Sequence, residues 1–240
     1  MPTPTGSSGR PSIDTPRISA NQLAEFVFST PAKKLRIAQD QKFGNPFSSP
    51  YYHHALTALL RSFQNGRYTR SLLQTSITEI SAIEPRSPNH ESKLRNNTEM
   101  LRHFLAILSP ATPPAGVHEI FYRNAYVVLD GVWISVRPEI VTRQSDTFCY
   151  TKLRFSKSRV SADASEIILL ILLEFGRRQA TDRMNFDIPN SRIVDCFAGI
   201  VVLGHNLPQI RSAQLQSALN EYRRLWASAE SPSSGYAAIA

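Results

Sequence analysis

The sequence predicts an α+β (α/β) fold in which a four-stranded mixed sheet is flanked by helices and preceded by a helical N-terminal lobe. Apolar residues recur at helical spacing over 17–108, and a connection with three prolines follows over 109–116. The remaining chain is rich in Ile, Phe, Tyr and Val, and its order is strands, helix, strand, helix. An antiparallel meander that continues through a crossover helix into a further strand gives such a mixed sheet.

The helical half is predicted from capping residues and apolar stripes. Ser19 with Gln22 three residues later has the spacing of a capping box, and Thr30-Pro31 is typical of the start of the next helix. Further helices are expected over 51–63, 70–83 and 97–108, with a loop over 85–89. The predicted parts are a disordered lead (1–16), a helical lobe (17–108), a sheet core (117–228, together with helix 97–108) and a flexible tail (229–240).

The sheet half is predicted from short runs rich in β-branched and aromatic residues. Strands are expected over 119–129 and 132–141, joined by a hairpin turn at Asp130-Gly131, and a third over 148–155. A helix over 162–179 is long enough to cross over to a fourth strand at 191–203. A last helix is expected over 208–227.

Composition limits the class of protein. The chain has 240 residues, 42% of them hydrophobic, which is enough for a sizeable core. Its longest apolar run, 167–173, is too short to span a bilayer, so a cytoplasmic protein without membrane association is expected. Two cysteines make neither a disulfide framework nor a zinc site. The net charge of +8 suits nucleic acid or an acidic partner, but a solvated basic surface is an equal alternative.

One group of residues in the sheet half suggests a catalytic site. Pro138-Glu139 is followed, after ten residues, by Tyr150-Thr151-Lys152. With the order helix, three strands, helix and strand, this pattern resembles the PD-(D/E)XK nuclease superfamily. That family places one acid late in the second strand and an acid-x-Lys sequence on the third. A weaker resemblance to its RecB- and Cas4-like members is carried by Ser19, Leu23, Phe26 and Thr30-Pro31. The iron–sulfur cluster of such members needs four cysteines, and this chain has two.

The resemblance implies a DNA-acting, Mg²⁺-dependent protein. Mg²⁺ takes oxygen ligands and can activate a water for phosphodiester hydrolysis. By resemblance, Glu139 is a metal ligand and catalytic residue, the Thr151 carbonyl is a second ligand, and Lys152 positions the water or offsets charge. The family also implies a partner such as an ATPase or helicase, in repair, mobile-element or antiphage-defence systems.

The chain departs from the family at Tyr150, where a second acid is expected. A neutral phenol is a poor Mg²⁺ ligand, so one carboxylate would remain where the family has two. Glu119, Glu99 and Asp146 are candidates to replace it. The alternative function is therefore a nuclease-fold subunit without catalysis, which binds nucleic acid or docks a partner.

Basic residues supply the candidate nucleic-acid contacts. Arg154 shares the strand alternation of Lys152, so both can face a phosphate backbone, and an exposed strand edge protected by charge is an equal alternative. Lys157 follows them, and Lys33 and Lys34 lie on the second predicted helix. The competing interpretation is an unrelated α+β domain in which Glu139 and Lys152 form a cross-strand ion pair.

Overall fold

A computed structural model describes residues 14–44, 52–62, 70–106, 116–120, 125–154, 162–196 and 199–230. The chain divides into two compact units. The first, here called the α8 unit, comprises Met1–Ser48, Asn124–Val136 and Pro208–Ala240, and the second, the main-sheet unit, comprises Ser49–Arg123 and Arg137–Leu207. The predicted class is confirmed, because helices flank a mixed sheet and the N-terminal part is helical. The helices expected within 17–108 are divided between the two units.

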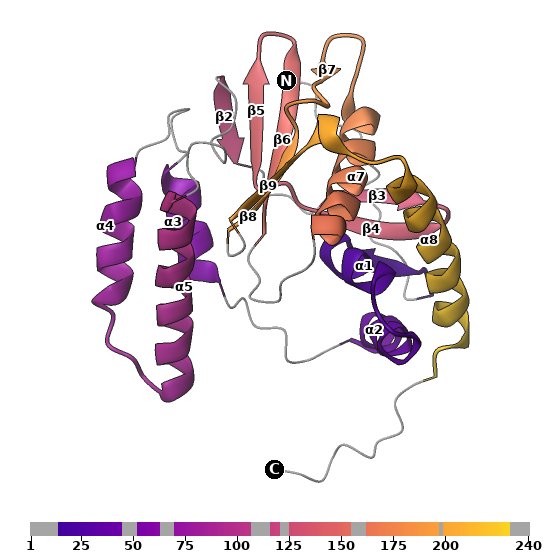
Figure 1. Cartoon of the computed structure of the whole chain (residues 1–240), viewed down its shortest axis with the longest axis horizontal. Helices are drawn as coiled ribbons and strands as arrows, with labels where there is room; N and C mark the ends of the chain where they lie inside the picture. The colour runs from indigo at the N-terminus through magenta and orange to yellow at the C-terminus, as the bar shows by residue number, and fades with distance from the viewer. Residues whose placement is uncertain are drawn as a thin grey trace. The chain divides into compact units, whose positions relative to one another are not determined.

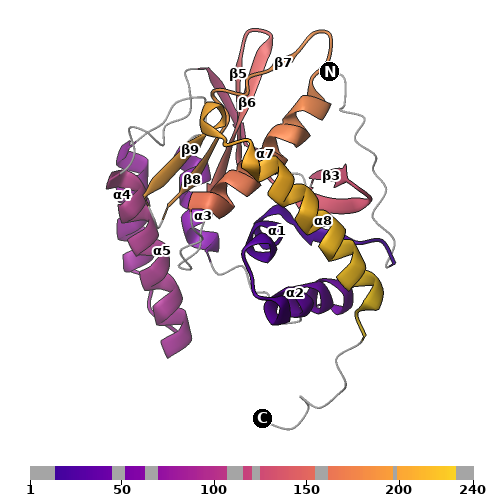
Figure 2. The same cartoon turned by 45° about the vertical axis from the view of Figure 1, so that its right-hand side comes forward.

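The α8 unit combines a small sheet with three helices (Figures 1 and 2). Its three strands have the order β1-β4-β3, with β4 parallel to β1 and antiparallel to β3. In both views α1, α2 and α8 lie close together. The elements are β1 (Arg17–Ser19), α1 (Ala20–Val27), α2 (Pro31–Phe43), β3 (Ala125–Leu129), β4 (Val132–Val136) and α8 (Ile210–Ser228).

Local sequence signals explain where these elements begin and turn. The Ser19 hydroxyl caps α1 by accepting a hydrogen bond of 3.2 Å from the Gln22 backbone N–H. Asp130 and Gly131 join β3 to β4 with φ values of 46° and 76°, as a tight hairpin turn requires. The predicted capping and hairpin are both confirmed.

Aromatic side chains attach α8 to the rest of its unit. The rings of Tyr222 and Phe26 meet edge to face at 5.3 Å. The Tyr222 hydroxyl donates a 2.7 Å hydrogen bond to the Arg17 carbonyl, and the Trp226 indole N–H donates a 3.2 Å bond to the Asp14 carbonyl. These buried aromatic residues therefore place one face of α8 against the N-terminal segment and α1.

The main-sheet unit has one large mixed sheet. Its strands have the order β2-β5-β6-β8-β9, with the short β7 beside β6. Strand β6 is parallel to β8, which follows the crossover helix α7, and the path is otherwise antiparallel. The elements are α3 (His53–Ser62), α4 (Arg70–Ser81), α5 (Pro88–Ala106), β2 (Val117–Ile120), β5 (Ile140–Gln144), β6 (Thr147–Arg154), α7 (Ala162–Gln179), β7 (Asn185–Phe186), β8 (Arg192–Asp195), β9 (Ile200–Leu203) and the 3₁₀ helix η2 (Gly204–Asn206).

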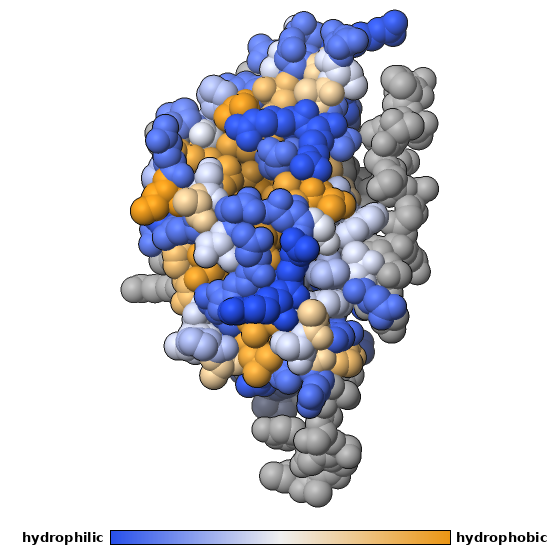
Figure 3. Space-filling model, turned by 90° about the vertical axis from the view of Figure 1, so that its right-hand side faces the viewer, coloured by the Kyte–Doolittle hydropathy of each residue, from blue (hydrophilic) through white to orange (hydrophobic). Residues whose placement is uncertain are grey.

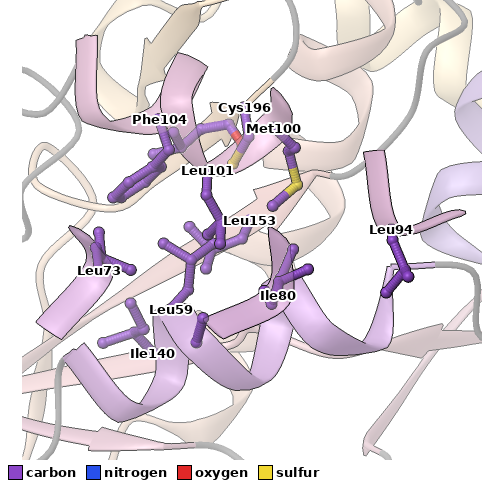
Figure 4. Close-up of a cluster of buried hydrophobic side chains, with 13 residues drawn as sticks. Leu59, Leu73, Ile80, Leu94, Met100, Leu101, Phe104, Ile140, Leu153 and Cys196 are labelled. Carbon is purple, nitrogen blue, oxygen red and sulfur yellow. The ribbon is translucent and has the colours of Figure 1, made fainter. Parts of the chain in front are cut away.

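Helices cover both faces of this sheet. Figure 4 shows the core formed where α3, α4 and α5 meet Ile140 of β5 and Leu153 of β6. On the other face, Phe175 of α7 stacks on Tyr150 of β6. Because successive residues of a strand point to opposite faces, Tyr150, Lys152 and Arg154 share the α7 face. In the part of the chain that the structure describes, no helix has the length and apolarity needed to cross a membrane.

Several predicted strands are divided in the structure. The expected strand 132–141 is two strands, β4 and β5, which belong to different sheets. Pro138 lies between them, and a proline has no N–H to donate to a ladder. The expected strand 119–129 likewise contains β2 and β3, and 191–203 contains β8 and β9, with Gly199 at φ 67° between them.

One predicted helix is longer at its start. Helix α5 begins at Pro88 rather than at residue 97, so the expected loop over 85–89 extends only to the helix start. The Ser87 hydroxyl accepts a 3.2 Å hydrogen bond from the His90 N–H, which is an N-terminal cap. The Ser87-Pro88 pair was the available signal, because proline is favoured in the first turn of a helix.

Replacing Gly176 in α7 by alanine is expected to destabilise the protein, although alanine is the better helix former. A Cβ at Gly176 would lie 2.2 Å from the Phe186 ring, which is itself held between Phe148 and Tyr150. Overpacking of this kind costs about 1–3 kcal/mol, against a helix-propensity gain of about 1 kcal/mol. Urea unfolding measures the difference. In a Phe186→Ala background the same change should instead be neutral or stabilising, and an equal loss in both backgrounds would contradict the steric explanation.

Candidate functional site: two buried ion pairs beside an aromatic cluster

Backbone pairing places Glu139 opposite Lys152. Glu139 directly precedes β5, and its N–H donates a 3.1 Å hydrogen bond to the Thr151 carbonyl of β6. The next pair in the register is Ile140 opposite Thr151. The expectation that Glu139 lies late in a strand over 132–141 is therefore wrong, because it directly precedes the start of β5, after Pro138. The two residues that the sequence singled out are nevertheless neighbours across the sheet.

The Glu139 carboxylate and the Lys152 ammonium group form a buried ion pair. Lys152 Nζ lies 3.1 Å from Glu139 Oε1, and the two side chains are only 7% and 8% exposed. The same ammonium group donates a 2.9 Å hydrogen bond to the Arg137 carbonyl. The second carboxylate oxygen, Oε2, accepts a 2.6 Å bond from the Leu153 N–H. The cross-strand ion pair of the competing interpretation is thus present, and both Glu139 oxygens have partners.

Burial governs the protonation of Glu139. Loss of solvation raises the pKa of this carboxyl above its ordinary value, because a charge is poorly tolerated in a site of low polarity. The Lys152 charge and the Leu153 N–H act in the opposite direction by favouring the ionised form. The charge of Glu139 therefore depends on Lys152.

A second buried ion pair joins β6 to β8. Arg154 is opposite Asp195 in the parallel register, and its guanidinium donates a hydrogen bond to Asp195 Oδ2. Their side chains are 4% and 3% exposed. Arg154 shares a strand face with Lys152, as predicted, but that face is buried at both positions. Lys157, the next predicted contact, lies outside the described residues.

Sequence reasoning did not identify Asp195 as part of the site. The available signal was a single carboxylate at the end of a largely apolar strand, with an arginine at the end of the preceding strand of the sheet. A charge in such a strand needs a partner, because burying it alone is costly. The partner could not be assigned, because the register of β6 against β8 arises only when α7 crosses over.

Tyr150 belongs to an aromatic cluster. Its ring stacks on Phe175 at 5.5 Å and also contacts Phe148 at 5.4 Å and Phe186 at 5.6 Å. The residue is 4% exposed, and burial raises the pKa of its phenol above the ordinary value. Apolar ring packing therefore occupies the position at which the nuclease family carries its second acid.

The described residues do not fit a Mg²⁺ ion at this motif. Mg²⁺ requires several oxygen ligands in octahedral geometry. Both Glu139 oxygens and the Thr151 carbonyl already accept hydrogen bonds, and Tyr150 packs among phenylalanines. Within the described ranges, no three His, Cys, Asp or Glu side chains are grouped so that they could hold a metal ion.

The candidate replacement acids do not fill the gap. Glu119 is half exposed and lies 3.1 Å from the Arg143 guanidinium, with which it forms an ion pair. Asp146 lies exposed in the turn before β6, and Glu99 lies on α5. None of them belongs to a metal-binding group in the part of the chain that is described.

The two lysines predicted to contact nucleic acid lie in the α8 unit and are both paired. Lys33 Nζ is 2.7 Å from the Glu25 carboxylate, and Lys34 Nζ is 2.6 Å from that of Glu221. Lys34 therefore links α2 to α8. These pairs reduce the positive charge that either lysine offers to a phosphate.

The two cysteines do not supply a nucleophile. Burial raises the pKa of Cys149 to about 11 and that of Cys196 well above its ordinary value. Since the thiolate is the reactive form, both side chains act as buried apolar groups at neutral pH.

In comparisons with known proteins, no family model matches this chain and no curated protein matches it.

Proposed function

We propose that this protein has a PD-(D/E)XK-like core and binds nucleic acid, DNA in the first place, without cutting it. In this proposal the motif residues Glu139 and Lys152 hold strands together and take no part in hydrolysis. The protein would then act as a subunit beside a catalytic partner such as an ATPase or helicase, as the resemblance implies. Fold alone does not assign activity, so the proposal depends on the side chains of the site.

The order of elements supports the nuclease-like core. Helix α5, strands β2, β5 and β6, helix α7 and strand β8 follow one another as helix, three-strand meander, helix and strand. The three strands are adjacent in the sheet, and β8 is added parallel to β6. The β3–β4 hairpin is an insertion between β2 and β5 in sequence.

The proposal that catalysis is absent rests on the ion pair between the two motif side chains. Glu139 and Lys152 satisfy each other in a site that is almost closed to solvent. To bind a metal ion, Glu139 would have to break its bonds to Lys152 and Leu153, and buried charges left without partners are costly. Tyr150 contributes an aromatic ring instead of a ligand.

The nucleic-acid part of the proposal is supported by charge. The chain carries 27 Lys and Arg against 19 Asp and Glu, and its pI is about 9.8. A positive surface attracts phosphate backbones through release of their counterions, largely without regard to sequence. Binding is therefore expected to weaken steeply as salt is added.

Cleavage and binding of labelled single- and double-stranded DNA test the proposal together. With Mg²⁺ or Mn²⁺, we expect no cutting above that of a Glu139→Gln variant, and binding that weakens with salt in both proteins. Glu139→Gln is the matched control, because the amide keeps an oxygen that accepts a hydrogen bond from Leu153. Metal-dependent cutting by the wild type that disappears in Glu139→Gln would instead establish a nuclease. Failure to bind any nucleic acid would reject the proposal.

A further inference from the structure

The α8 unit contains an open pocket that is separate from the ion pairs of the main sheet. Its volume is about 570 Å³. One wall is formed by the N-terminal segment at Asp14 and Pro16, and another by Lys42 at the end of α2. The third wall is the C-terminal half of α8, including Arg223 and Arg224.

Most of the α8 residues that line the pocket form one exposed stripe of the helix, and the buried Trp226 lines it as well. Asn220, Arg223, Arg224 and Ala227 follow one another at intervals of three, one and three residues, which places them on one side of a helix. All four are exposed, whereas Tyr222 on the opposite side of α8 is buried. Figure 3 shows the side of the molecule on which α8 lies, where strongly hydrophilic residues are grouped.

Hydrogen bonds connect the backbone segments that form one end of the pocket. Lys42 Nζ donates 2.9 Å hydrogen bonds to the carbonyls of Trp226 and Ala229, and so caps the C-terminus of α8. The Trp226 indole N–H is bonded to the Asp14 carbonyl, which ties the N-terminal segment to the same helix end. A ligand in the pocket would therefore meet a preformed surface, with little ordering of the backbone to pay for.

Arg223 and Arg224 differ from three lysines of the same unit, whose ammonium groups have partners. Lys33 and Lys34 are ion-paired, and Lys42 is bonded to carbonyls. Within the described ranges, neither the Arg223 nor the Arg224 guanidinium forms an ion pair or a side-chain hydrogen bond. One carboxylate, that of Asp14, lines the pocket against three cationic side chains. Its ligand is therefore expected to be an anion.

We propose that this pocket binds phosphate groups, through the guanidinium groups of Arg223 and Arg224. Guanidinium groups bind phosphate oxygens with paired hydrogen bonds, and two of them on one helix face suit neighbouring phosphates. The phosphates can belong to a nucleic-acid backbone or to a free nucleotide. The backbone form of the inference rests on the proposed function, since it assigns the nucleic-acid contact to this surface.

The test is a charge-reversal variant, Arg223→Glu with Arg224→Glu, measured by anisotropy of labelled duplex DNA. We expect the Kd to rise about tenfold or more at low salt, and the slope of log K against log salt to fall by about 2. The matched control reverses Arg95 and Arg102, which are exposed on α5 in the other unit. It makes the same change in net charge and should shift the Kd by less than about threefold. Circular dichroism verifies that each variant is folded.

Competition separates the two sources of phosphate and the two proposals. Unlabelled duplex and ATP are added as competitors, and ATP binding is also measured directly by calorimetry. If duplex binds the wild type, and the Arg223/Arg224 and control variants weaken binding equally, this inference fails while the proposed function stands. If duplex does not bind but ATP binds and is lost only in the Arg223/Arg224 variant, the pocket is a nucleotide site and the proposed function fails.

Discussion

Replacing Lys152 by methionine is expected to lower the free energy of unfolding by about 3–5 kcal/mol at neutral pH. The change keeps the aliphatic part of the side chain but leaves the Glu139 carboxylate buried without its cation. Urea unfolding followed by circular dichroism measures the loss. The double variant Glu139→Gln with Lys152→Met should recover most of it, because the amide is neutral and still accepts a hydrogen bond from the Leu153 N–H.

The loss in Lys152→Met should also depend on pH. Burial raises the pKa of Glu139 in the folded protein, and removing Lys152 removes an interaction that lowers it. A carboxyl whose pKa is higher in the folded state stabilises the folded protein in its protonated form. This contribution is fully present below the unfolded pKa, near 4.5, and it is lost as the pH rises through the folded pKa. The variant should therefore be more stable near pH 5 than near pH 8, with a slope of up to about 1.4 kcal/mol per pH unit. The double variant should lack this slope, and a pH-independent loss would contradict the assignment.

Restoring an acid at the motif by Tyr150→Glu is expected to destabilise the protein by about 3–5 kcal/mol and to leave it without metal-dependent activity. The substitution removes an aromatic ring from contact with Phe148, Phe175 and Phe186, and it places a carboxylate among apolar rings. Thermal unfolding with Mg²⁺ and with EDTA measures the stability and any metal binding, and cleavage of labelled DNA with Mg²⁺ measures the activity. We expect the same Tm in the two conditions.

Tyr150→Phe is the matched control for this prediction. It keeps the ring and removes only the hydroxyl, so its loss should stay within about 1–2 kcal/mol. A restored metal site would bind Mg²⁺ in the folded state alone. At a Mg²⁺ concentration a hundredfold above the Kd, this binding would raise the stability of Tyr150→Glu by about 2.7 kcal/mol. Such a gain, absent in Tyr150→Phe, would show that the site needs only one acid to become a metal centre.

Local patterns in the sequence were enough to predict the class of fold and most of its helices. Ser19 capped its helix, Asp130-Gly131 formed its turn, and the apolar stretch that became α7 crossed over to a further strand as expected. Glu139 and Lys152 could be singled out, because they match the acid and the lysine of the nuclease motif that the sequence resembles. Their ion pair was one of two interpretations that the sequence left open.

The surroundings of these side chains, in contrast, depend on packing between elements that are far apart in the sequence. A sequence shows that Lys152 and Arg154 share a face, but not that this face is buried or that β8 supplies Asp195. It shows that Tyr150 is not an acid, but not that Phe175 and Phe186, distant in sequence, enclose its ring. Likewise, the sequence does not show that Arg223 and Arg224 line one pocket together with Asp14 and Lys42. Such contacts join residues far apart in the chain, and the register and burial that create them follow from the packing of whole elements, which no local pattern encodes.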